Sequence, residues 1–156
     1  MTTYKHTQIG YLMIAITLLV LALFGWLQIT ARMEPASVDS GANFLMTAII
    51  ALIIFILASL STLTVTIDEQ FLHIRFGWGI FHKKFLLSEI ATVKSVKNRW
   101  YYGWGIRFWL WPKMWIYNLS GFDAVEITLK NGRVYRIGTD EPGKLEAAVK
   151  QELIVG

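Results

Sequence analysis

The pattern of apolar and polar positions begins with two long stretches that carry no charged side chain. Residues 9–31 are uncharged over their whole length, and residues 44–61 are uncharged and rich in Leu, Ile and Phe. About 20 apolar residues of helix are enough to cross the ~30 Å hydrocarbon core of a bilayer. A secretory signal is the alternative for the first stretch, but its apolar region spans only about 7–15 residues. The pattern therefore predicts two retained transmembrane helices, at 9–31 and 44–61.

Polar segments flank these two stretches. Residues 1–8 form a short polar start, which we interpret as a cytoplasmic tail. Residues 32–43 are polar and contain the helix breakers Pro35 and Gly41, so they predict a short external connector. A connector of this length makes the two helices an antiparallel hairpin.

The placement of Lys and Arg predicts the orientation of that hairpin. Only Arg32 lies in the connector, whereas four cations lie close to the other helix ends: Lys5, Arg75, Lys83 and Lys84. Loops that are rich in Lys and Arg stay in the cytoplasm. We therefore expect a multi-pass protein of the cell inner (cytoplasmic) membrane, with both termini in the cytoplasm.

From Thr62 the apolar period changes from that of a helix to that of a strand. Leu63, Val65 and Ile67 alternate with threonines, and similar stretches follow at regular intervals, separated by turn signals such as Asn131-Gly132. The pattern predicts about seven strands in a row. A final amphipathic helix is expected over about 140–154, with its apolar face made by Leu145, Ala148, Val149 and Leu153. Residues 62–156 are thus expected to form one α+β domain, in which the helix closes the open end of a barrel.

Three short blocks add a resemblance to a known family. These blocks are GWGIR at 103–107, WIYNLSG at 115–121 followed by DAVEI, and RIGTDEP at 136–142. Together with the paired helices, they resemble a largely uncharacterised group of small bacterial two-helix membrane proteins with a pleckstrin-homology-like domain. The resemblance covers roughly residues 62–153. It implies a seven-stranded, partly open pleckstrin-homology-like barrel capped by a C-terminal helix, and it implies no known reaction.

The same resemblance raises the question of inositol phosphates, which some pleckstrin-homology domains bind with basic residues between their first two strands. In this chain that loop is Asp68-Glu69-Gln70, which is acidic. A phosphate placed there would meet like charge at close range. We therefore expect no phosphoinositide site at this loop.

Charge and aromatic residues together indicate a candidate binding surface. The chain has a net charge of +4, and no acid occurs between Ile90 and Phe122. Residues 99–117 contain five of the seven tryptophans and nine aromatic residues in all. Trp and Tyr settle at lipid headgroups, and each nearby cation adds attraction to an anionic leaflet. The predicted lipid- or partner-contacting residues are Lys94, Lys97, Arg99, Trp100, Trp104, Arg107, Trp111 and Lys113.

The alternative for these rings is that they form the core and its cross-strand pairs. We expect both, with about half of the rings engaged in packing. Basic and aromatic residues also suit single-stranded nucleic acid, but a membrane anchor argues against that partner.

The sequence offers little for catalysis. It has no cysteine, no nucleophile-elbow motif and no Gly-rich phosphate loop before a helix. His73 and His82 lack the further ligands that a zinc site needs. We therefore predict a non-enzyme without metal or cofactor. The main hypothesis is a membrane-anchored binding or scaffolding module that contacts membrane lipid or a partner protein, or that forms a homo-oligomer. The alternative is an accessory subunit of a larger membrane complex such as a transporter.

Overall fold

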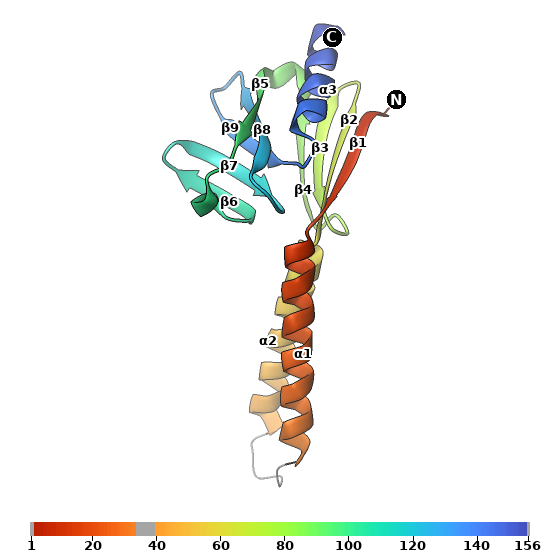
Figure 1. Cartoon of the computed structure of the whole chain (residues 1–156), viewed down its shortest axis with the longest axis vertical. Coiled ribbons are helices and arrows are strands. Elements are labelled where there is room, and N and C mark those ends of the chain that lie inside the picture. The colour runs from red at the N-terminus through yellow and green to blue at the C-terminus, as the bar shows by residue number, and fades with distance from the viewer. Residues whose placement is uncertain (1, 34–39, 156) are drawn as a thin grey trace.

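The computed structural model describes residues 2–33 and 40–155, which form a stalk of two helices below a β-rich head (Figure 1). Both the first strand and the last helix lie in the head. In chain order the elements are β1 (Thr2–Ile9), α1 (Tyr11–Met33), α2 (Ser40–Ser59), β2 (Thr62–Asp68), β3 (Phe71–Phe76), β4 (Phe81–Leu86), η1 (Leu87–Glu89), β5 (Ile90–Lys97), η2 (Trp100–Tyr102), β6 (Gly105–Leu110), β7 (Lys113–Asn118), β8 (Asp123–Leu129), β9 (Val134–Gly138) and α3 (Pro142–Val155).

The stalk consists of α1 and α2, which run antiparallel and side by side. Gln28 Nε2 donates a hydrogen bond to Thr47 Oγ1 at 3.2 Å and joins the two helices. Within the described residues, Tyr11–Ala31 is long and apolar enough to cross a membrane, whereas Phe44–Ser59 is a shorter apolar helix. The second predicted span, 44–61, is thus shorter than expected at its end, because the chain leaves the helix at Ser59 to enter β2. Most of the predicted connector, at 34–39, lies outside the described residues.

The first strand corrects the prediction of a polar tail over residues 1–8. Thr2–Ile9 pairs antiparallel with β2, and its register runs from Thr2 opposite Asp68 to Ile9 opposite Thr62. The sequence predicted a tail because the strand that pairs with this segment follows both helices in the chain. A pairing between such distant segments leaves no signal in the local sequence. As a result, α1 leaves the head and α2 returns to it at the same ends of two paired strands. The amide of Gly10 donates to the carbonyl of Ser61 at 2.8 Å and closes this junction.

The head contains two sheets. The first has the strand order β1-β2-β3-β4, and the second has the order β5-β8-β9-β7-β6, in which only β7 and β9 are parallel. The prediction of an α+β domain is confirmed. In the described residues, however, the sheets do not close into a barrel, and eight strands rather than seven follow α2. The extra strand arises because the aromatic stretch folds as η2 followed by the β6–β7 hairpin.

The main core lies between the inner faces of the two sheets and under α3. The alternating residues of β2 are buried as predicted, and Leu145 and Val149 of α3 are fully buried. Thr139 Oγ1 accepts a hydrogen bond from the amide of Glu141 at 3.1 Å just before α3 begins. The amphipathic C-terminal helix is therefore confirmed, and it packs against β5, β8 and β1.

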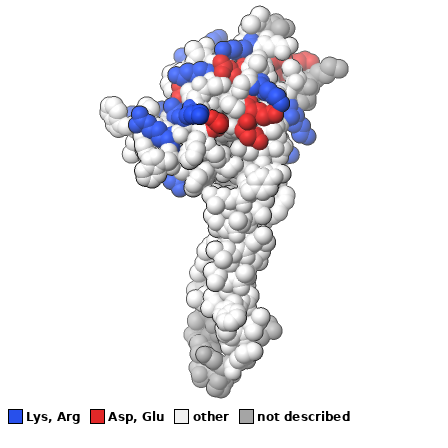
Figure 2. Space-filling model, viewed as in Figure 1, with Lys and Arg blue, Asp and Glu red and all other residues white. Residues whose placement is uncertain are grey.

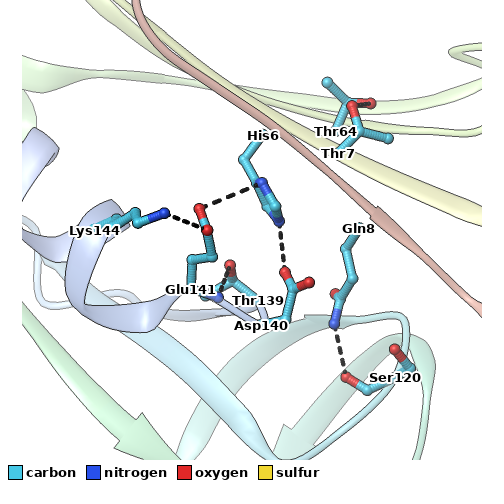
Figure 3. A network of polar contacts seen from close by, with 9 residues as sticks. All are labelled: His6, Thr7, Gln8, Thr64, Ser120, Thr139, Asp140, Glu141 and Lys144. Atoms are coloured by element: carbon cyan, nitrogen blue, oxygen red, sulfur yellow. Dashed lines mark hydrogen bonds and ion pairs between the residues drawn. The ribbon is translucent and has the colours of Figure 1, made fainter.

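A polar network ties β1 to the rest of the head (Figure 3). The ring of His6 contacts the carboxylates of both Asp140 and Glu141, which directly precede α3. Two positions further on, Gln8 Nε2 donates to the carbonyl of Ser120 at 3.2 Å, in the connection between β7 and β8. β1 is thus held both by the residues that directly precede α3 and by the connection between β7 and β8.

Candidate functional site

The junction between head and stalk brings a tryptophan of the head against a helix of the stalk. The β3–β4 turn lies against the start of β2 and the end of α2: the Gly77 amide donates to the carbonyl of Thr62 in β2 at 2.8 Å, and Gly77 also lies close to the backbone of Ser59. The ring centroid of Trp78 lies 5.7 Å from that of Phe55, one turn before the end of α2. Trp78 is 68% exposed even so. The sequence analysis did not single out Trp78, because the glycines on either side of it indicate only a turn; a large apolar side chain at that turn was the signal that could have found it.

The eight predicted contact residues do not form one patch. They fall into three groups: Lys94 and Lys97 on β5; Arg99, Trp100 and Trp104 in the connection that contains η2; and Arg107, Trp111 and Lys113 on the β6–β7 hairpin. β5 and β6 are the two opposite edges of the second sheet. The structure therefore separates the cations of β5 from those of the hairpin.

Lys94 belongs to an ion-pair network. Its Nζ lies 2.9 Å from Glu126 Oε1, and Arg136 Nε lies 2.7 Å from Glu126 Oε2. Burial raises the pKa of Glu126, but hydrogen bonds from Lys94 and Arg136 outweigh it and hold this pKa below its usual value. Lys97 stands opposite Asp123 in the β5–β8 register. These two lysines thus have acidic neighbours, which reduces their attraction for an anionic ligand.

The rings of the aromatic stretch divide between packing and surface, as expected. Tyr102 is buried in a small second cluster with Met114 and Ile116, and Trp109 packs against this cluster. Tyr117 belongs to the main core. In contrast, Trp100 and Trp111 are 78% and 88% exposed. The second sheet therefore buries rings on both of its faces, and its most exposed rings lie in η2 and at the tip of the β6–β7 hairpin.

Charged side chains gather on the head, away from the uncharged stretches 11–31 and 44–59 of the stalk (Figure 2). Figure 2 shows Lys, Arg, Asp and Glu on the head, while the described length of the stalk on this face carries none. Neither 11–31 nor 44–59 contains a charged residue. Beside the stalk, Trp78, Ile80 and Phe81 add exposed apolar surface at the turn into β4. Arg107 and Lys113, both exposed, are the cations of the β6–β7 hairpin.

His73 of β3 and His82 of β4 contact different partners. His73 Nε2 lies 2.9 Å from Asp68 Oδ2, whereas His82 Nδ1 lies 3.1 Å from the carbonyl of Gly79. Among the described residues, no group of three or more His, Cys, Asp or Glu side chains could hold a metal ion.

A hollow of about 590 Å³ lies beside η1 and the end of α3, away from the stalk. Its rim mixes Glu69 and Glu152 with Lys130 and apolar side chains such as Leu87 and Leu153. Charges of both signs line it, so it selects neither an anionic nor a cationic ligand.

Comparison with protein-family models, with curated proteins and with solved structures found no match to this chain.

Proposed function

We propose that this protein is a membrane-anchored, non-catalytic binding module whose head lies on the cytoplasmic surface of the inner membrane, in the manner of a small pleckstrin-homology-like protein. One observation carries this proposal. β1 and β2 are paired in the head, and α1 and α2 run antiparallel directly below them. If α1 crosses a bilayer, α2 must cross it too, because α2 returns the chain to the same side.

The short apolar part of α2, Phe44–Ser59, is compatible with this role. A span that is shorter than the hydrocarbon core is accommodated by local thinning of the bilayer, at a cost of fractions of a kcal/mol per Å. The head follows with almost no linker, since α2 ends at Ser59 and β2 begins at Thr62. The stalk-side surface of the head therefore lies at the level of the lipid headgroups, where Trp78 finds the interfacial environment that Trp prefers.

The ligand that this placement favours is anionic lipid. Arg107 and Lys113 are exposed on the β6–β7 hairpin, and β6 lies toward the stalk in the head (Figure 1). Each such cation adds about 1 kcal/mol of attraction to an anionic leaflet. A partner protein that binds the exposed rings is the competing interpretation, and it leads to an accessory subunit.

The lipid contact is tested with the double variant Arg107→Glu/Lys113→Glu of the full chain in phosphatidylcholine nanodiscs, with and without phosphatidylglycerol. We expect phosphatidylglycerol to slow amide hydrogen exchange in β6 and β7 of the unsubstituted protein. The variant should lose this effect, because it removes at least about 2 kcal/mol of attraction.

The matched control is Lys130→Glu/Arg133→Glu, which makes the same change of charge at the β8–β9 turn, away from the stalk. It should keep the response to phosphatidylglycerol. If phosphatidylglycerol does not change the rate of amide hydrogen exchange in β6 and β7 of the unsubstituted protein, the lipid contact is contradicted. A stoichiometric membrane protein recovered with the chain in mild detergent would instead support the accessory subunit.

The orientation is tested by labelling single cysteines, since the chain has none of its own. Met33→Cys reports the end of the stalk far from the head, and Lys144→Cys reports the exposed start of α3. With a membrane-impermeant maleimide on intact cells, we expect Met33→Cys to react and Lys144→Cys to react only after permeabilisation. The excess of Lys and Arg on the head side dictates this result, and the reverse pattern would overturn the assignment.

A further inference from the structure

The two sheets leave an open groove between their facing edge strands, β4 and β6. This hollow has a volume of about 240 Å³. Its lining is mainly apolar and comes from both sheets: Ile74, Phe76, Phe81, His82 and Lys83 from the first sheet, Ile80 from the β3–β4 turn, and Ile106 and Tyr117 from the second sheet. It arises because, in the described part of the chain, no strand bridges β4 and β6 to close a barrel.

Apolar surface continues from the groove along the β6–β7 hairpin. Phe108 stands opposite Trp115 in the register, and the two ring centroids lie 5.2 Å apart. These residues are 46% and 40% exposed, and Phe81 across the groove is 38% exposed. A chain of half-exposed large apolar side chains along a concave surface is typical of a binding groove.

The groove begins at the membrane side of the head. Ile80 in its lining lies two positions after Trp78, whose ring packs against Phe55 of α2. The groove is therefore continuous with the surface that meets the stalk. A molecule that enters it from the bilayer has only to pass the end of α2.

One cation faces this groove. Lys83 Nζ lies 5.9 Å from the ring centroid of Phe85, which is buried in the core between the sheets. The neighbouring Lys84 points to the other face of the sheet, where its Nζ lies 3.3 Å from the centroid of Phe71. The lining contains no Asp or Glu, so the positive charge of Lys83 is not neutralised there.

An inward-facing lysine on an edge strand also has a structural role, because it discourages pairing with the edges of other sheets. That role accounts for Lys83 alone. It does not explain why the apolar side chains of Phe81, Phe108 and Trp115 are exposed.

We propose that this groove holds one acyl chain of an anionic phospholipid from the adjacent leaflet, with the phosphate of that lipid at Lys83. This inference rests on the proposed function, because it requires the head to lie on the bilayer. Pockets for whole small molecules measure about 300–1,000 Å³. The smaller hollow here fits part of one chain, while the rest of the lipid stays in the leaflet.

The test uses the full chain in nanodiscs that contain phosphatidylglycerol with a photoreactive diazirine on one acyl chain, followed by peptide mapping. We expect labelling of the β4 and β6 peptides in addition to α1 and α2. Lys83→Glu should lower the β4 and β6 labelling by about tenfold or more, because it reverses a charge beside the phosphate. Lys84→Glu is the matched control on the other face of the same strand and should label as the unsubstituted protein does.

The outcomes separate this inference from the proposed function. Labelling of α1 and α2 with none in β4 and β6 overturns the groove assignment and leaves the membrane anchor intact. Equal labelling of β4 and β6 in Lys83→Glu, or by a phosphatidylcholine probe, overturns the role of Lys83 with an anionic headgroup. Crosslinks between two copies of the chain at β4 and β6, in place of lipid, would show that a second strand occupies the groove.

Discussion

Gly77→Ala is expected to lower the stability of the full chain by about 3 kcal/mol, because it places a Cβ atom inside the head–stalk junction. Gly77 has a φ of +46°, and a Cβ built on it would lie within 3 Å of the backbone carbonyl group of Ser59. A backbone carbonyl cannot move aside as a flexible side chain can. The measurement is thermal unfolding in detergent, where this loss corresponds to a fall of roughly 6–12 °C in Tm.

Gly132→Ala is the matched control for this prediction. Gly132 also has a positive φ, of +80°, but nothing lies within 4 Å of a Cβ at that position. This substitution should therefore cost only the conformational strain, about 1–2 kcal/mol. Equal shifts in the two variants would contradict the close contact between the β3–β4 turn and the end of α2.

Local patterns predicted those parts of the fold that depend on neighbouring residues. The alternation of Leu63, Val65 and Ile67 predicted β2, and the spacing of Leu145 and Val149 predicted the buried face of α3. Each of these elements places its buried apolar side chains on one face only, so its period is visible in the sequence. The turn at Asn131-Gly132 likewise follows from local turn chemistry.

The sequence did not predict elements whose partner strands are distant along the chain or whose two faces are both covered. β1 pairs with a strand that lies beyond both helices, so no local signal marks it. β7 buries Met114 and Ile116 in the small cluster and Tyr117 in the main core, and this removes the alternation that identifies a half-buried strand. Residue type alone also could not show that Lys94 faces Glu126, because that contact depends on the register between β5 and β8.

Arg136→Ala is expected to cost about 3–5 kcal/mol in the free energy of unfolding at about pH 7, because it leaves a buried carboxylate with too few partners. Glu126 is only 8% exposed and would keep Lys94, whose side chain is mostly exposed, as its remaining ion pair. The guanidinium also lies 5.4 Å from the ring centroid of Tyr102 and holds the η2 connection against the sheet. Lys144→Ala, which removes the exposed ion pair with Glu141, is the control and should change stability by less than about 0.5 kcal/mol.

The pH dependence of this loss identifies its cause. Burial raises the pKa of Glu126, but Lys94 and Arg136 more than compensate, so its pKa in the folded protein lies below the ordinary value of 4.5. A carboxyl with a lowered folded pKa contributes stability that is complete above its unfolded pKa and is lost as pH falls through the folded one. The difference in unfolding free energy between the unsubstituted protein and Arg136→Ala should therefore narrow as pH falls from about 7 to about 3. A difference that stayed constant over this range would mean that Arg136 acts through its packing on Tyr102 rather than through the charge of Glu126.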